Sequence, residues 1–249
     1  MKEKALFFDP FRIISPKHNA EALRLEDLHS RPVSEAVSLQ EGLLMMSSKI
    51  IEMIRLLSKC VVSGSQKQMD ACESLAKEVH QQEKVLTTDL ASSKLRTDLL
   101  KGLIRFPYRM AGIGDMLERI LNRCRVKGRD GIPFTYKAHE ELHQLFVFLS
   151  DMITNLRDSL VTPNKVILEH IMSQSKKLGQ MLLDFRLAHW KRLEGGFCSP
   201  LASSTYLAIL DSMTAINEHL NRMCATLLEL GTTSSAVGEA REQAEEKRA

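Results

Sequence analysis

The sequence predicts an all-α protein, elongated and built as two tandem three-helix bundles. Three observations predict this fold. Apolar residues recur at alternating spacings of three and four through six long segments, as on the buried face of a packed helix. No segment shows the apolar–polar alternation of a strand. The third and sixth segments also share one apolar rhythm, which indicates an internal repeat.

Composition is that of an ordinary globular protein. The 249 residues are 44% hydrophobic and 26% charged, enough for one large domain or two smaller ones. The net charge of +3 is too small to indicate nucleic-acid binding. Five cysteines without a C-x-x-C pair indicate a reducing compartment rather than a disulfide framework. No signal peptide is evident and no apolar run approaches the length of a membrane span, so we expect a cytoplasmic protein.

The first half of the chain predicts an arm and three helices. Residues 1–35 contain three prolines and short apolar pieces, which predict an irregular arm. The first helix is predicted from about residue 37 to 62, and the more polar second helix from about 66 to 93. The third has an unbroken apolar seam of Leu99, Leu103, Phe106, Met110, Ile113, Leu117 and Ile120. Within it, we expect Pro107 to kink the helix and Tyr108 to pack between helices.

The pattern then repeats in the second half. Helices are predicted at about 136–160 and 165–193, with a sixth from Ser199-Pro200 to about residue 230. Trp190 and Tyr206 are expected to be packing or interface aromatics. We place the two repeats at 36–131 and 132–230, and a disordered tail at 231–249, which has few apolar residues.

Helices three and six correspond residue by residue. Ile113 corresponds to Ile216, 103 residues later, and Leu117 to Leu220. At this offset Asp115 corresponds to Glu218, so an acid lies two residues past the same seam position in both helices. Eight Lys or Arg residues against three acids lie between residues 101 and 130. Such a helix end either attracts phosphate or an acidic partner, or is simply a solvated charged face.

Two segments resemble the PhoU-like family. The run RFPYRMAGIGD (105–115) is similar to its third-helix motif R-x-P-Y-x-x-E-R-I-G-D. HWKRLEGGFCSP (189–200), followed by YLAILDSMTAINEH (206–219), is most similar to the cytoplasmic PhoU-like domain of sodium/phosphate cotransporters, here expected in a free-standing form. There H-x-x-R-L, G-x-C-S-P and Y-L-x-L-L…E-R-I-x-D-H occur in this order. The resemblance covers residues 35 to 230 approximately and is specific in these two segments.

The resemblance implies a non-enzymatic regulator of phosphate uptake or phosphate signalling. Its partner would be a phosphate transporter or a phosphate-sensing histidine kinase, and it would reach the membrane only through that partner. It implies no nucleic-acid partner, and whether the chain is a monomer or a homodimer stays open. A helical adaptor with no phosphate role is the alternative among binding proteins.

The resemblance also implies iron or zinc bound by E/D-x-x-x-D motifs, because residues four apart share one helix face. Here Ala111 and Thr214 occupy the two glutamate positions, so each motif keeps one carboxylate. Either the remaining acids bind metal with help from neighbours, or they lie on a solvated face without metal. The candidate metal ligands are Asp115, Glu118, Glu218 and His219.

The segment HEELH (139–143) has the H-E-x-x-H spacing of zinc proteases. In such a helix two histidines bind zinc and the glutamate activates water, so His139, Glu140 and His143 are candidate residues of a metal-dependent hydrolase. No third ligand follows at a usual spacing, and no strand is predicted to hold a substrate. We therefore rank this hydrolase below the regulator.

Overall fold

The protein is all-α over the part of the chain that the structure, a computed structural model, describes: residues 33–92, 102–162 and 164–246. This confirms the predicted fold class. The predicted arm lies almost wholly outside the described residues. The long helices are α1 (Val33–Ser63), α2 (Gln66–Ser92), α4 (Phe106–Arg129), α5 (Tyr136–Val161), α6 (Lys165–Glu194) and α7 (Pro200–Glu246).

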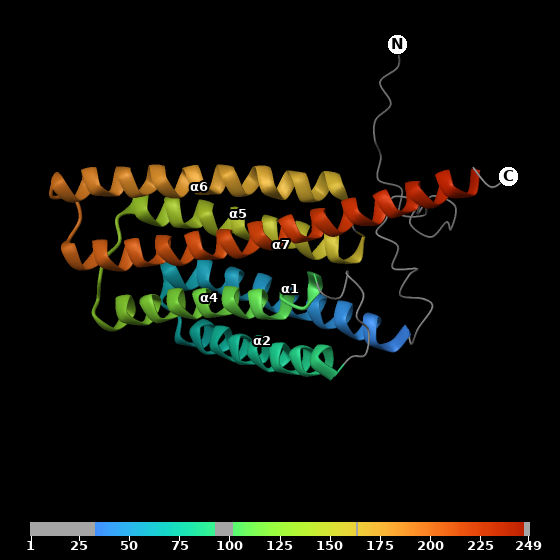
Figure 1. The fold of residues 1–249 in the computed structure, drawn as a ribbon. Helices are drawn as coiled ribbons and strands as arrows, with labels where there is room; N and C mark the ends of the chain where they lie inside the picture. Colours follow the sequence, from blue (N-terminus) through green and yellow to red (C-terminus); the bar gives the residue numbers. More distant parts are fainter. Residues whose placement is uncertain (1–32, 93–101, 163, 247–249) are drawn as a thin grey trace, which may run out of the picture.

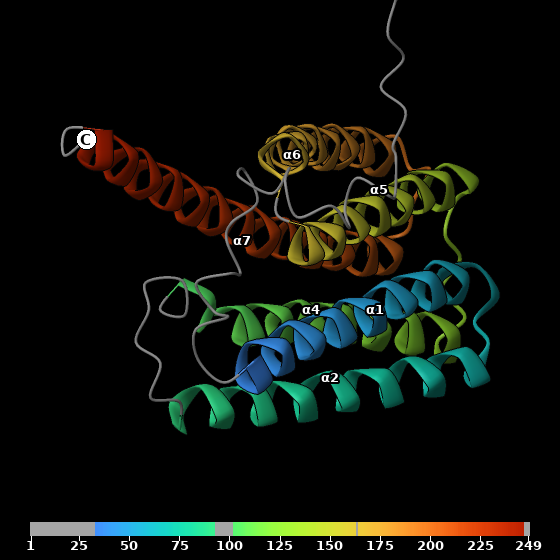
Figure 2. The same ribbon diagram turned by 90° about the vertical axis from the view of Figure 1, so that its right-hand side faces the viewer.

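The six helices lie side by side along one long axis and form two triplets (Figures 1 and 2). Helices α1, α2 and α4 pack together, and so do α5, α6 and α7. The triplets are joined through contacts of α1 with α5 and of α4 with α7. Apolar side chains from both triplets form one continuous core. No described helix combines the length and hydropathy needed to cross a membrane.

The apolar seams explain which helix faces are buried. In α4, Ile113 and Leu117 are at most 1% exposed, and so are their repeat equivalents Ile216 and Leu220 in α7. A polar cap marks the start of α5, where the Thr135 hydroxyl accepts a hydrogen bond from the Ala138 amide. The six predicted helices are present. Of the seam predicted for the third, the residues from Phe106 to Ile120 are buried, Leu103 is partly buried, and Leu99 lies outside the described residues.

The prediction for Pro107 is wrong in its detail. Helix α4 begins at Phe106, so Pro107 lies in the first turn, where its missing N–H costs no helical hydrogen bond. It therefore starts the helix instead of kinking it. Tyr108 does not pack between helices, because its side chain is 68% exposed. Trp190 is also half-exposed, whereas Tyr206 is buried as expected.

Helix α7 differs from the prediction at its end. The sequence predicts a disordered tail from residue 231, but α7 continues to Glu246 and projects beyond the other helices (Figure 1). The low apolar content of this segment was the basis for the prediction. It does not oppose helix formation, since charged residues and alanine are good helix formers.

The burial of the cysteines predicts how many thiols react quickly in the native protein. All five are free; Cys60, Cys72, Cys124 and Cys224 are buried, and burial raises the pKa of the last three to about 12. Cys198 is partly exposed. Because the thiolate is the reactive form, we expect one fast-reacting thiol in the native protein and five after denaturation, measured with a chromogenic disulfide reagent. Cys198→Ser should remove the fast reaction; fast labelling of a second thiol in that variant would contradict the burial.

Candidate functional site

A cluster of three potential metal ligands lies between α2 and α4. His80 Nε2 is 3.3 Å from Asp115 Oδ1 and 3.4 Å from Glu118 Oε2. It is the one group of at least three His, Cys, Asp or Glu side chains within ligand distance that the described residues contain. One imidazole nitrogen and two carboxylate oxygens suit zinc or iron, and the partly exposed side chains leave room for water as a further ligand.

The other two candidate ligands lie elsewhere. Glu218 is exposed, and His219 packs against α4, where a Cβ built on Gly112 would lie 2.7 Å from the His219 Cε1 atom. Burial lowers the pKa of the His219 imidazole, and the nearby Arg109 and Arg222 lower it further. The ring is therefore neutral at pH 7. The structure thus brings His80 beside two of the four predicted ligands. Of the other two, His219 lies at the contact of α4 with α7, and Glu218 is exposed beside it in the chain.

The H-E-x-x-H segment lacks the surroundings of a zinc site. Glu140 forms an ion pair with Lys137 at 2.8 Å, and the Nδ1 atom of the exposed His143 lies 3.3 Å from Ser58 Oγ. His139 is partly buried. Neither histidine belongs to a group of three candidate ligands within the described ranges. The geometry therefore gives no support to a hydrolase.

Helices α4 and α7 run antiparallel in close contact. A Cβ on Gly112 would meet His219, and a Cβ on Gly102, ten residues earlier, would lie 2.7 Å from Leu230. Residues with higher numbers in α4 therefore face residues with lower numbers in α7. The absence of a side chain at Gly112 is what lets the His219 ring reach the α4 backbone.

Three arginines flank this contact; we call Arg105, Arg109 and Arg222 the arginine seam. Arg109 precedes Gly112 by three residues and Arg222 follows His219 by three, so the antiparallel register places them opposite each other. Partial burial lowers the pKa of Arg109, and the charges of Arg222 and Arg105 lower it further.

No hydrogen bond or ion pair joins these three side chains to an acid in the described part of the chain. Glu218 lies one helical turn from Arg222 without forming an ion pair with it. Three like charges without counter-charges repel one another, so the arginine seam is a candidate site for a negatively charged partner.

A buried polar network joins α5, α6 and α7. The Glu141 carboxylate, 1% exposed, accepts hydrogen bonds from Arg192 Nη1 at 2.8 Å and Nη2 at 2.7 Å, and from the Tyr206 hydroxyl at 2.6 Å. Burial and the hydrogen bond to Glu141 raise the pKa of Tyr206, so its phenol stays protonated. His189 stacks on Tyr206, with ring centroids 4.5 Å apart. Burial lowers the pKa of His189, and Arg192 lowers it further.

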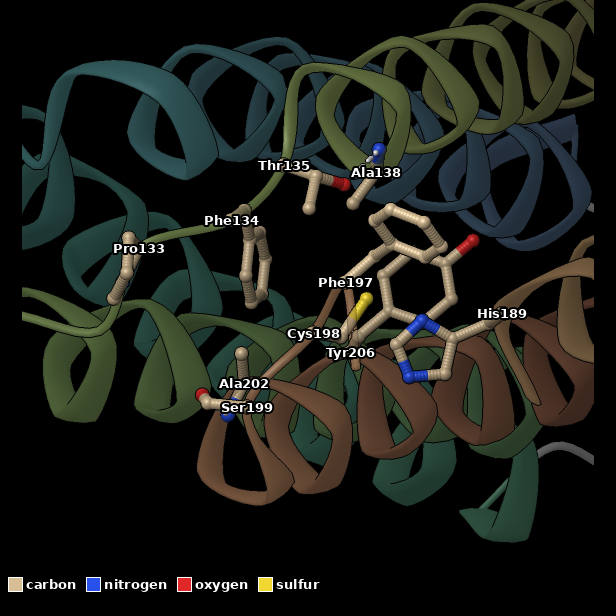
Figure 3. A pocket seen from close by; sticks show the side chains of 10 residues that line it. All are labelled: Pro133, Phe134, Thr135, Ala138, His189, Phe197, Cys198, Ser199, Ala202 and Tyr206. Carbon is tan, nitrogen blue, oxygen red and sulfur yellow. Dashed lines mark hydrogen bonds between the residues drawn. The ribbon is translucent and has the colours of Figure 1, made fainter. Parts of the chain in front are cut away.

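A cavity of about 160 Å³ adjoins this network (Figure 3). It lies at the end of the molecule where α6 ends and α5 and α7 begin (Figure 1). Aromatic rings and small residues make most of its wall, with three hydroxyls, one thiol and one imidazole among them. The lining residues are Pro133, Phe134, Thr135, Ala138, His189, Phe197, Cys198, Ser199, Ala202 and Tyr206.

The helix order and the two joined triplets define a known all-α fold. PhoU from Pseudomonas aeruginosa has this fold: a TM-score of 0.71 at 12% identity, covering 79% of this chain and 97% of that one. The phosphate transport system regulatory protein PhoU from Streptococcus pneumoniae gives 0.62 at 15% identity, covering 80% and 96%. No protein-family model and no curated protein sequence matches the chain.

The chain therefore has the PhoU fold, as the sequence resemblance implies. The closer resemblance to the domain of sodium/phosphate cotransporters stays a prediction, because neither structural match concerns a cotransporter.

Proposed function

We propose that this chain is a PhoU-like regulator of phosphate uptake or phosphate signalling. It acts without catalysis, by binding a phosphate transporter or a phosphate-sensing histidine kinase at the cytoplasmic side of the membrane. The observation that carries the proposal is the PhoU fold, which spans 97% of the Pseudomonas aeruginosa protein. The Streptococcus pneumoniae neighbour is described as a phosphate transport system regulatory protein, which supports the same role for this chain.

The partner docks on the arginine seam. Arg109 is already partly desolvated, and no acid in the described ranges neutralises the arginine seam. An acidic surface on the partner supplies the missing counter-charges, and burying charge-assisted hydrogen bonds there favours the complex. Association on such a surface weakens as salt concentration rises.

Complementation of a gene deletion tests this function. We expect deletion to alter phosphate uptake or phosphate-responsive expression, and the wild-type gene to restore both. Arg109→Glu with Arg222→Glu should fail to restore them, because the reversed charges repel an acidic partner. The matched control reverses Arg119 and Arg123, two exposed arginines on α4 outside the arginine seam.

The two outcomes that would contradict the proposal are distinct. A deletion that leaves phosphate uptake and phosphate-responsive expression unchanged favours the helical adaptor. Full complementation by the Arg109→Glu, Arg222→Glu variant rejects the arginine seam as docking surface but leaves the regulatory role standing. Circular dichroism of both double variants should show that each keeps its helical content.

We further propose that His80, Asp115 and Glu118 bind iron or zinc. Their spacing fits a mononuclear site, with one imidazole and two carboxylates as ligands. A bound ion would supply a fixed positive charge and link α2 to α4, holding the first triplet in one arrangement.

Elemental analysis of protein purified without chelator tests the metal site. We expect roughly one iron or zinc ion per chain in the wild type, and a drop of at least tenfold in His80→Ala with Asp115→Ala. The control Glu78→Ala, an exposed α2 acid paired with Lys49, should keep the metal. Metal retained in the double variant would reject this ligand set, and metal-free wild-type protein would reject the site altogether.

A further inference from the structure

The cavity beside the buried network contains a polar side chain without a partner. His189 is 2% exposed, and neither of its ring nitrogens has a hydrogen-bond partner. In Figure 3 its ring lies beside Tyr206 on the cavity wall. Buried polar groups in folded proteins nearly always have a hydrogen-bond partner. A group bound in the cavity would supply one for the His189 imidazole.

The hydroxyls of Thr135 and Ser199 on the cavity wall can each donate a hydrogen bond. The Thr135 hydroxyl oxygen accepts from the Ala138 amide at 3.2 Å, and that of Ser199 accepts from the Ala202 amide at 3.1 Å. Each hydroxyl proton is left without an acceptor in the described structure. Both residues immediately precede a helix, α5 or α7, and the positive ends of two helix dipoles therefore meet at this cavity.

The wall is rich in hydrogen-bond donors and has no free carboxylate. No acidic side chain lines the cavity, and the nearby Glu141 is already satisfied by Arg192 and Tyr206. Donors and helix N-termini together favour a group with negatively charged oxygens.

The size of the cavity and its apolar wall restrict the part of the ligand that lies beyond the negatively charged oxygens. The cavity of about 160 Å³ is close to the size that holds a benzene molecule in engineered proteins. The rings of Phe134 and Phe197 offer an apolar surface against which a carbon body can pack. A bare inorganic ion leaves this surface unfilled.

We propose that the cavity binds a small organic anion: an oxyanion group held by His189, Thr135 and Ser199, on an apolar body that packs against Phe134 and Phe197. A carboxylate and a phosphoryl group share this chemistry. The site is independent of the proposed docking surface and metal, which lie at other helix contacts. A ligand there would link the starts of α5 and α7 to α6 and stabilise the second triplet.

Calorimetric titration of the purified full chain tests the ligand class. The probes are isovalerate, its neutral analogue 3-methylbutanol, its cationic analogue 3-methylbutylamine, and inorganic phosphate. We expect isovalerate to bind at least tenfold more tightly than either the alcohol or the amine. Inorganic phosphate has no apolar body, so phosphate binding more tightly than isovalerate would overturn the proposed organic ligand. The proposal would be overturned if neither anion binds, or if 3-methylbutanol binds with the same affinity as isovalerate.

Two variants assign the binding to this cavity. His189→Phe keeps the ring stacked on Tyr206 but removes both nitrogens, and should weaken isovalerate binding at least tenfold in a folded protein. Ala202→Leu fills the cavity and should abolish binding, whereas Ala208→Leu, on the same helix outside the wall, should leave it unchanged. Unchanged binding in His189→Phe rejects the site even if Ala202→Leu fails to fold.

Discussion

Replacing Glu141 with alanine is expected to lower the free energy of unfolding by about 3–5 kcal/mol. The carboxylate is buried and receives two hydrogen bonds from Arg192 and one from Tyr206. Its removal leaves the Arg192 guanidinium, whose side chain is 17% exposed, without a counter-charge, and leaves the Tyr206 hydroxyl without an acceptor. Chemical denaturation followed by circular dichroism measures the change.

Two further variants separate a lost counter-charge from lost packing. Glu140→Ala removes the adjacent, partly exposed carboxylate and should change stability little. The triple replacement of Glu141 by Leu, Arg192 by Met and Tyr206 by Phe removes the whole network. It should recover most of the lost stability, because apolar side chains of similar volume often replace a buried ion pair without cost. If the triple variant is as unstable as Glu141→Ala, the cost lies in packing.

Leu117→Ala and Leu220→Ala are each expected to cost about 2–5 kcal/mol. These leucines are repeat equivalents in α4 and α7, and neither is exposed to solvent. Truncation of either leaves a cavity in the continuous core that both triplets share. We expect each variant to shift the entire unfolding transition, since a cavity on either side weakens the same core.

Thermal and chemical unfolding of the two variants show whether the repeats are independent. The control Leu183→Ala removes a leucine that is 48% exposed and should cost much less. Two separate transitions in Leu117→Ala, with only the first displaced, would contradict a shared core and support two domains at 36–131 and 132–230.

The helices could be predicted because burial leaves a periodic trace in the sequence. The seams of α4 and α7 alternate by three and four, and the structure buries these residues. The start of α4 could not be predicted, because the apolar seam continues upstream of Pro107 and a proline suits either a kink or a first turn. Tyr108 lies two residues from both Phe106 and Met110, off the buried face of the helix, which accounts for its exposure.

The site was predictable only in part. The family resemblance pointed to Asp115, and Glu118 was a neighbouring acid in the same helix. His80 was not predicted, because the periodicity of one helix does not determine its register against a neighbouring helix. Glu141 was treated only as part of the H-E-x-x-H segment. Its spacing from Ala138 and Leu145, three and four residues, places a charged residue on an apolar seam. That conflict was the available signal for a buried ion pair.

The facing arginines at the antiparallel contact of α4 and α7 are not repeated at the equivalent positions of the other repeat. At the offset of the repeat, Arg109 corresponds to Ser212 and Arg222 to Arg119. The pair Arg109 and Arg222 therefore has, as its repeat equivalent, one serine and one arginine, Ser212 and Arg119. On the proposed docking surface, a partner that recognises the pair would attach in a single orientation, and we expect one partner bound per chain.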